Sequence, residues 1–294
     1  MKIGILGFGA VGISVYYELK DYKDIYILVD EARKEKYENT KFYVNENLIT
    51  PNYVTNEVMD LVIVAVKNYD LDNALDSITP FVNKNTILLP LLNGIEAHDK
   101  IKERFPFNRV LYGVINIEAN KNGNKIKASK IINLQYGDEY NYNLKAPLMF
   151  LRKLFNSYKI NNNIYHDMKR RMWLKWMLNL GINQYSALYN MTYLEMNNKD
   201  SLEYLFNIYD EVYKVALAYK INLTLDDLEY TKNMCRNFKS NRVTSLTDDV
   251  NNKRKDESYY FGHKLISLAE AKNIDVPYNK KIYKDLCKKI EDNR

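Results

Sequence analysis

Cysteine, proline and glycine are scarce in this sequence of 294 residues, which has two, six and ten of them. The cysteines, Cys235 and Cys287, lie far apart and belong to no CxxC or Cys/His cluster, which excludes a disulfide framework and argues against a bound metal. No apolar run approaches the roughly 20 residues needed to cross a bilayer, and the first residues predict a strand, not a charged leader. We therefore expect a cytoplasmic protein without a membrane or metal partner.

A dominant charge of one sign is also lacking. The 43 lysines and arginines are interleaved with 37 aspartates and glutamates, for a net charge of +6. Because the basic residues form no block or stripe, the composition argues against a nucleic-acid partner. The small positive excess favours attraction of an anionic substrate or cofactor.

The second half of the chain is the part poorest in helix-breaking residues. From about Asp167 onward no proline occurs until Pro277, the only glycines are Gly181 and Gly262, and apolar residues recur with a helical period. No Gly/Ser-rich linker precedes this segment. We predict two abutting domains, residues 1–166 and an all-α domain over residues 167–294.

The first half alternates apolar strands with helical spacing. The predicted parallel strands cover residues 3–6, 25–29, 61–66 and 86–89, with a short additional strand at 41–44. This rhythm predicts an α/β fold, a Rossmann-type doubly wound parallel sheet with right-handed crossovers. Residues 110–118 and 125–135, joined by a turn at Gly123, predict one antiparallel hairpin appended to that sheet.

A glycine-rich turn follows the first strand. Gly7 permits a tight turn, Gly9 lets the main chain approach a pyrophosphate, and Gly12 lets helix and strand pack closely. The second strand ends at an acid, Asp30. A simple structural turn is the alternative, but this context predicts dinucleotide binding. The expected cofactor contacts in the turn are Gly7, Phe8, Gly9, Ala10, Val11 and Gly12.

Polar residues lie in one stripe of an otherwise apolar helical segment. Lys175, Asn179 and Asn183 are four residues apart, so each step turns only about 40° around a helix. A partly desolvated lysine beside two amides needs hydrogen-bond acceptors, and a substrate would supply them. The alternative is a solvated stripe, because Lys and Asn are common on exposed faces.

Two further sets complete the candidates. Ser245, Asp249 and Glu257 are spaced so that one side of a helical segment would hold them. Lys67 and Asn93 directly follow strands, and ligands of open α/β sheets bind outside the carboxyl ends of the strands. Both side chains are therefore predicted to face the nicotinamide end of a dinucleotide, although Lys67 as the first exposed residue after a strand is the alternative.

These motifs together resemble the ketopantoate reductase (2-dehydropantoate 2-reductase) family along nearly the whole chain. The matching elements, in order, are GFGAVG, VAVKNY, LLNG, the W-x-K-x-x-x-N-x-x-x-N beginning at Trp173, T-S-x-x-x-D, Glu257 and the late Val276-Pro277. The resemblance implies reduction of ketopantoate to pantoate by NAD(P)H in pantothenate biosynthesis.

The resemblance also implies residue roles. Lys175 would be the general acid that protonates the ketone oxygen, which is consistent with the need of a developing alkoxide for a nearby cation. Glu257 would bind the substrate hydroxyl and orient Lys175. The remaining implied contacts are Asn179, Asn183 and Ser245 to the substrate, and Lys67 and Asn93 to the nicotinamide ribose and the closed cleft.

The sequence departs from the family at two places. The family commonly uses NADPH and often has an arginine where this chain has Asp30, whose carboxylate would bind a ribose 2′-OH and repel a 2′-phosphate. NADH preference follows, unless Arg33 and Lys34 reach the phosphate. The family segment N-x-S-S-M-L-Q-D is replaced here by NRVTSLTDD, which offsets Asn241 by one position and adds Arg242 as a new carboxylate ligand candidate.

The sequence is also compatible with two other functions. A related NAD(P)-dependent dehydrogenase for another small 2-keto or 3-hydroxy acid would keep the glycines, Lys175 and Asn179 and change the wall from Ser245 to Glu257. A non-catalytic dinucleotide-binding protein would have no need of the polar stripe. The sequence leaves the oligomeric state open, with a homodimer as the assembly to test.

Overall fold

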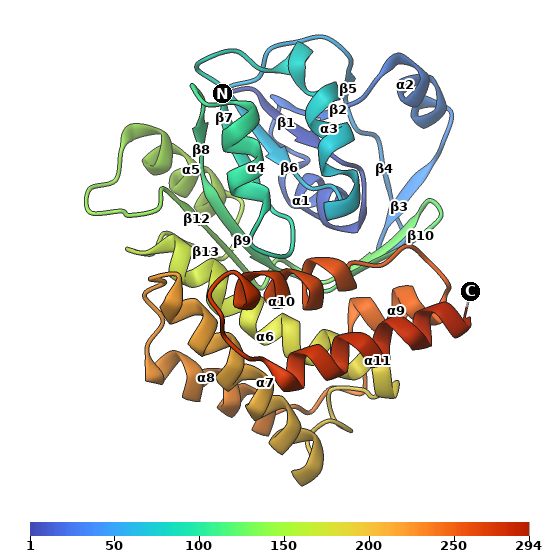
Figure 1. Ribbon diagram of the computed structural model, residues 1–294. Coiled ribbons are helices and arrows are strands. Elements are labelled where there is room, and N and C mark those ends of the chain that lie inside the picture. Colours follow the sequence, from blue (N-terminus) through green and yellow to red (C-terminus); the bar gives the residue numbers. More distant parts are fainter. Residues whose placement is uncertain (294) are drawn as a thin grey trace. The chain divides into compact units, whose positions relative to one another are not determined.

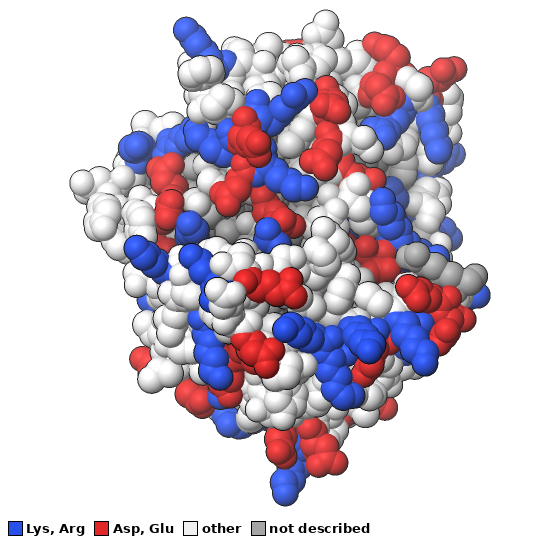
Figure 2. Space-filling view, in the orientation of Figure 1, with Lys and Arg blue, Asp and Glu red and all other residues white. Residues whose placement is uncertain are grey.

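The computed structural model describes residues 1–293, and the chain divides into two compact units, Met1–Met168 and the residues from Lys169 onward (Figure 1). No helix among the described residues is long and apolar enough to cross a membrane. Basic and acidic side chains are interspersed on the face shown in Figure 2, and along α11 (Pro277–Asn293) Lys280 and Lys281 each pair with an aspartate.

A six-stranded sheet forms the centre of the first unit. Its strand order is β5-β2-β1-β6-β7-β8, and all neighbouring strands are parallel. The strands are β1 (Ile3–Leu6), β2 (Ile25–Leu28), β5 (Tyr53–Val54), β6 (Leu61–Val64), β7 (Ile87–Pro90) and β8 (Arg109–Val110). The helical elements are α1 (Ala10–Leu19), α2 (Glu31–Glu38), η1 (Asn68–Asp70), α3 (Leu71–Ser77), η2 (Thr79–Phe81), α4 (Ala97–Arg104) and α5 (Ala146–Ser157).

Helices cover both faces of this sheet. In β1, Ile3 and Ile5 pack into a core with residues of α1 and α5, whereas Leu6 packs with residues of α3 and α4. Alternate side chains of a strand point to opposite faces, so a strand that is apolar throughout must be covered on both sides. The predicted doubly wound parallel sheet is confirmed.

The predicted antiparallel hairpin is confirmed, since residues 112–122 run back along residues 125–137 across the turn at Gly123. Its expected place in the six-stranded sheet is wrong, because the hairpin is divided into two pairs of strands that belong to two other sheets. The strands of one are β10 (Ala119–Asn122) and β11 (Lys125–Ala128), and those of the other are β9 (Tyr112–Asn116) and β12 (Asn133–Gly137). The first pair joins β3 (Phe42–Val44) and β4 (Asn47–Ile49) in a second sheet, and the second pair joins β13 (Asn162–Asn163) in a third. An alternating pattern identifies the strands of a hairpin but not the sheet that the hairpin joins, and here Ile126 of β11 is buried with Phe42 and Val44.

The described residues of the second unit form helices joined by loops, without a strand, which confirms the all-α prediction. Its long helix α6 contacts α7 at Gly181, η3 at Trp176 and α9 at Ser186. At Gly181 of α6 a Cβ would lie 2.5 Å from the ring of Tyr209 in α7, so glycine permits the close approach of these two helices. The helices are α6 (Met168–Tyr189), α7 (Lys199–Ala218), α8 (Leu225–Arg236), α9 (Ser245–Asn251), η3 (Ser258–Tyr260), α10 (Gly262–Glu270) and α11.

Candidate active site

The glycine turn between β1 and α1 has an open side. Gly7 has φ +102°, a backbone conformation that favours glycine, and a Cβ at Gly12 would lie 1.9 Å from the Gly7 carbonyl oxygen. At Gly9, which precedes α1, a Cβ would meet only the Ala65 carbonyl oxygen at 3.9 Å. No side chain caps α1 and its first turn holds no acid. The first amides of α1 are therefore available to an anion such as a pyrophosphate.

Asp30 lies beyond the end of β2 and caps α2. Its carboxylate accepts a hydrogen bond from the backbone N–H of Arg33 at 2.6 Å, and the Arg33 guanidinium lies 3.6 Å from the same carboxylate. Both side chains are more than half exposed. In such folds the residue after the second strand distinguishes a ribose 2′-OH from a 2′-phosphate. Here a carboxylate and a guanidinium lie side by side at that position.

Lys67 and Asn93 lie beyond the carboxyl ends of β6 and β7, as predicted from the sequence. The side chain of the buried Asn68 donates a 2.9 Å hydrogen bond to the Asn93 backbone carbonyl and so links the two loops. Gly94 follows with φ +91°. Sequence reasoning missed Asn68, whose signal was an amide placed directly after the lysine that follows a buried strand.

The predicted polar stripe is present on α6. Lys175 and Asn179 are half-buried, and Asn183 is 5% exposed. Within residues 1–293, no hydrogen bond to another residue engages the side-chain amide of Asn179 or Asn183. Buried amides are normally hydrogen-bonded, so these two are suited to bind a polar ligand.

Glu257 acts electrostatically on Lys175. Burial lowers the pKa of Lys175 to about 8, and the charge of Glu257 opposes that shift. Glu257 is 5% exposed and directly precedes η3. The indole of Trp176, next to Lys175, donates a 3.2 Å hydrogen bond to the Tyr260 carbonyl, which fixes η3 against α6. An amine that titrates near neutral pH is suited to donate a proton.

Ser245 is the first residue of α9 and is exposed. A chain of buried hydroxyls holds this end of α9 on α6: Ser186 lies 2.7 Å from Thr247, which lies 2.9 Å from the N-cap residue Thr244. The sequence prediction did not include these hydroxyls, although Thr244 was part of the motif that suggested the family.

The prediction that one helical segment holds Ser245, Asp249 and Glu257 is wrong. The helix α9 ends at Asn251, and Arg254 in the following loop pairs with both Asp248 and Asp249, the latter at 2.9 Å. The reason is that Asn251, Asn252 and Lys253 end the helix, with Lys253 at φ +53°. Glu257 is consequently placed by the loop and by η3.

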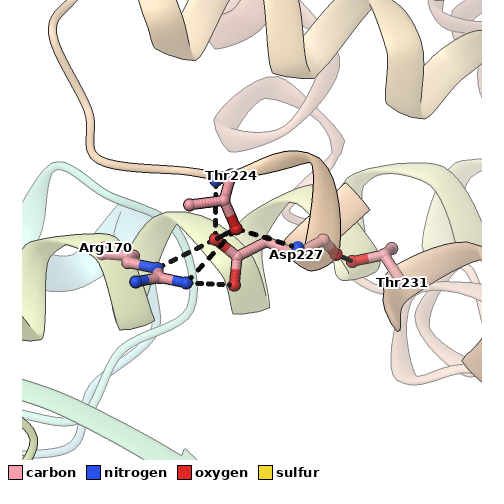
Figure 3. Close-up of polar contacts among 4 residues, drawn as sticks. All are labelled: Arg170, Thr224, Asp227 and Thr231. Carbon is pink, nitrogen blue, oxygen red and sulfur yellow. Dashed lines mark hydrogen bonds and ion pairs between the residues drawn. The ribbon is translucent and has the colours of Figure 1, made fainter. Parts of the chain in front are cut away.

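Arg170 and Asp227 join the first turns of α6 and α8, and Figure 3 shows this network with Thr224 and Thr231. Asp227 also forms a capping box with Thr224. Two other residues raised by the sequence, Asn241 and Arg242, are exposed in a loop whose backbone pairs with the segment at Tyr193 and Leu194.

The described residues contain no group of three or more His, Cys, Asp or Glu that could hold a metal ion. The candidate site consists of the lysine and amides of α6, the Glu257 carboxylate and the Ser245 hydroxyl. Such groups transfer protons and bind oxygen atoms of a small substrate.

The comparisons with known proteins agree along the chain. Residues 3–139 match the family described as "Ketopantoate reductase PanE/ApbA", and residues 167–290 match its C-terminal family. A 2-dehydropantoate 2-reductase of Pyrococcus horikoshii is 26% identical, over 95% of this chain and 94% of its own length.

Solved structures show the same fold. A dimeric ketopantoate reductase from Staphylococcus aureus has a TM-score of 0.85 and 20% identity, with 100% of both chains covered. A D-mandelate dehydrogenase, solved with NADH and anilino(oxo)acetate, has a TM-score of 0.88 and 20% identity, with 100% of this chain and 99% of that chain covered.

Proposed function

Because the chain belongs to the ketopantoate reductase family, whose members are oxidoreductases acting on a CH–OH group, we propose that it reduces ketopantoate to pantoate with NAD(P)H. The observation that carries this proposal is the stripe on α6. It combines a lysine whose pKa burial lowers to about 8 with two amides that no other described residue engages.

The proposed reaction uses this stripe to complete the reduction of a ketone. A dinucleotide, when bound, would provide the hydride for the carbonyl carbon. Lys175 would give its ammonium proton to the carbonyl oxygen and become a neutral amine. A cation there stabilises the alkoxide charge as it develops. Glu257 accepts a hydrogen bond from the substrate hydroxyl and keeps Lys175 protonated, because its charge raises the lysine pKa.

The amides and Ser245 give the substrate its orientation. Asn179 and Asn183 follow Lys175 along α6 at one-turn intervals, so they can bind oxygens of the same small molecule. The side chain of Ser245, at the start of α9, is exposed. The buried hydroxyls of Ser186 and Thr247 hold α9 on α6. These contacts are proposed for the hydroxyl and carboxylate ends of ketopantoate.

The first unit is proposed to bind the dinucleotide. The open side of the turn at Gly9 and the uncapped start of α1 support a pyrophosphate site there. Lys67 and Asn93 are proposed to contact the nicotinamide ribose. Asp30 favours NADH, since a second anion beside its carboxylate would be repelled.

We propose that the two units have different roles, cofactor binding and substrate binding. The unit ending at Met168 carries the proposed cofactor residues, and the unit that follows carries Lys175, the amides, Ser245 and Glu257. We also propose a homodimer, in line with the Staphylococcus aureus relative described as dimeric. Sedimentation of the purified protein tests that assembly.

A second candidate function is reduction of a different 2-keto acid. The D-mandelate dehydrogenase supports it, because that protein has the same fold and is named for a different 2-hydroxy acid. The departure of this chain from the family pattern at NRVTSLTDD supports it as well, since that segment surrounds Ser245. In this version Lys175 and Glu257 keep their roles and the substrate side chain differs.

The deciding experiment follows the reduced nicotinamide absorbance with purified protein, NADH or NADPH, and a panel of keto acids. Ketopantoate turnover with the highest kcat/KM of the panel supports the proposed function. Faster turnover of benzoylformate or 2-ketoisovalerate supports the second candidate. Binding of dinucleotide without turnover of any keto acid contradicts both and supports a non-catalytic protein.

A further inference from the structure

A lysine far from the glycine turn in sequence holds the backbone of that turn. Lys121 lies on β10 of the second sheet, and its ammonium donates a 2.7 Å hydrogen bond to the carbonyl oxygen of Phe8. Phe8 stands between Gly7 and Gly9, the residues that shape the open side of the turn.

The environment of this ammonium is mostly aromatic. Its nitrogen lies 5.6 Å from the ring centroid of Phe8 and 5.5 Å from that of Phe42. The Phe8 ring in turn contacts Tyr37 and Tyr53, so the lysine end belongs to a packed cluster. Burial lowers the pKa of Lys121, and the positive charge of Lys36 adds to that effect.

The placement of Lys121 differs from that of the other lysines on the same hairpin. Lys125 and Lys127 on β11 are exposed, whereas Lys121 is half-buried and its ammonium contacts the glycine turn at Phe8. Removing an ammonium from water is costly unless charged hydrogen bonds and aromatic faces compensate. An apolar side chain would fill the same space without that cost, so the charge itself has a use at this position.

The hydrogen bond also fixes the direction of a peptide group. In a trans peptide the C=O and the N–H point to opposite sides. Holding the Phe8 oxygen toward β10 therefore directs the Gly9 N–H away from the hairpin. Backbone amides of this turn are the groups expected to receive a pyrophosphate.

We propose that Lys121 is a positioning residue for the dinucleotide pyrophosphate: it orients the Phe8–Gly9 peptide and places a positive charge beside the turn. The inference rests on the proposed binding of NAD(P)H by the first unit. It gives the hairpin β10–β11 a role in cofactor affinity, while the groups proposed to act on the substrate lie on α6, at the start of α9 and at Glu257 just before η3.

The test compares Lys121→Met with the matched control Lys127→Met, which removes an exposed lysine from the same hairpin. Dissociation constants for NADH are measured by nicotinamide fluorescence, together with thermal unfolding of the ligand-free proteins. Loss of a charge-assisted hydrogen bond predicts that Lys121→Met weakens NADH binding by about tenfold. The control variant is expected to keep the wild-type constant.

If Lys121 positions the cofactor, Lys121→Met should raise KM for NADH more than it changes kcat. Lys121→Arg keeps a charged donor and should recover most of the affinity for NADH. If Lys121 only stabilises the fold, Lys121→Met should lower the melting temperature and leave KM for NADH unchanged. Should Lys121→Met fail to fold, Lys121→Gln replaces it, with a severalfold loss of NADH affinity expected.

The outcomes separate this inference from the proposed function. Wild-type protein that binds neither NADH nor NADPH overturns both. Wild-type protein that binds NADH, with a lysine-free variant at position 121 that binds it equally well, overturns the inference alone. Equal losses in the variants at positions 121 and 127 also overturn it, because the effect would then come from net charge.

Discussion

Arg170 and Asp227 are joined by two hydrogen bonds, Nε to Oδ2 at 2.9 Å and Nη2 to Oδ1 at 3.0 Å. The same carboxylate accepts the backbone N–H of Thr224 at 2.8 Å within the capping box of α8. This contact fixes the first turns of α6, the helix that carries Lys175, to α8 (Figure 3).

Asp227→Ala is therefore expected to lower the free energy of unfolding by about 2 kcal/mol, since it removes a helix cap and a charged hydrogen-bond pair. Arg170→Met should lower it less, because the cap remains. Denaturant unfolding of both single variants and the double variant measures the coupling. Additive effects of the two substitutions would show that the ion pair contributes nothing.

Acid should act on the same contact. Burial tends to raise the pKa of Asp227, but the hydrogen bonds and charge of Arg170 and the bonds from Thr224 outweigh it and hold the pKa below its usual value. A carboxyl with a lowered folded pKa stabilises the protein above its unfolded pKa, and this contribution is lost as the pH falls through the folded pKa. The stability gap between wild type and Asp227→Ala should accordingly narrow below about pH 4.

The features predicted correctly from the sequence are those encoded locally. The glycines at 7, 9 and 12 follow a buried strand, so their spacing predicts the turn between β1 and α1. The run at 61–66 is apolar throughout, so it predicts a strand that is covered on both faces. The contacts that were missed join distant parts of the chain. Lys121 to Phe8 and Arg170 to Asp227 leave no periodic signal, because each depends on which elements pack together. The wrong sheet expected for the hairpin has the same cause, since alternation in 125–135 does not show which further strands the hairpin joins.

Lys175→Ala is expected to lower kcat by about 10² to 10⁴, the usual worth of general acid catalysis, and to leave the dissociation constant for NADH largely unchanged. Because a general acid must be protonated, kcat/KM of the wild type should be constant at low pH and fall above about pH 8, the lowered pKa of Lys175. A control at the exposed Lys199 should change neither. An unchanged kcat in Lys175→Ala would show that Lys175 is not the general acid.

Glu257→Gln tests the partner of that lysine. The Glu257 charge raises the Lys175 pKa, so its removal should shift the alkaline fall of kcat/KM to lower pH. The KM for the keto acid should rise as well, because a charged hydrogen-bond acceptor for the substrate hydroxyl is lost. The comparison variant is Glu270→Gln, which removes an exposed carboxylate from α10. An unchanged pH profile with a lower melting temperature would indicate a structural role only.

Asp30→Asn separates charge from helix capping. Asparagine caps helices about as well as aspartate, so α2 should remain intact while the anion is removed. We expect the wild type to prefer NADH and the variant to lose about tenfold of that preference, measured as the ratio of kcat/KM for NADH and NADPH. Wild-type preference for NADPH would assign discrimination to Arg33 and Lys34, and Arg33→Met should then weaken NADPH binding.

Two alanine substitutions in the glycine turn should have opposite profiles. Gly9 has φ −82° and ψ −173°, which alanine also adopts, and its Cβ would have free space. Gly9→Ala should therefore fold with a normal melting temperature and bind NADH at least about tenfold more weakly, because the methyl group occupies space that the pyrophosphate needs.

Gly12→Ala should fail at the level of the fold. Glycine to alanine within a helix ordinarily adds up to about 1 kcal/mol of stability. Here the new Cβ would lie 1.9 Å from the Gly7 carbonyl oxygen, so α1 must move away from β1 and the melting temperature should fall. A Gly9→Ala protein that binds NADH like the wild type, beside a destabilised Gly12→Ala protein, would mean that this turn serves only to pack α1 against the sheet.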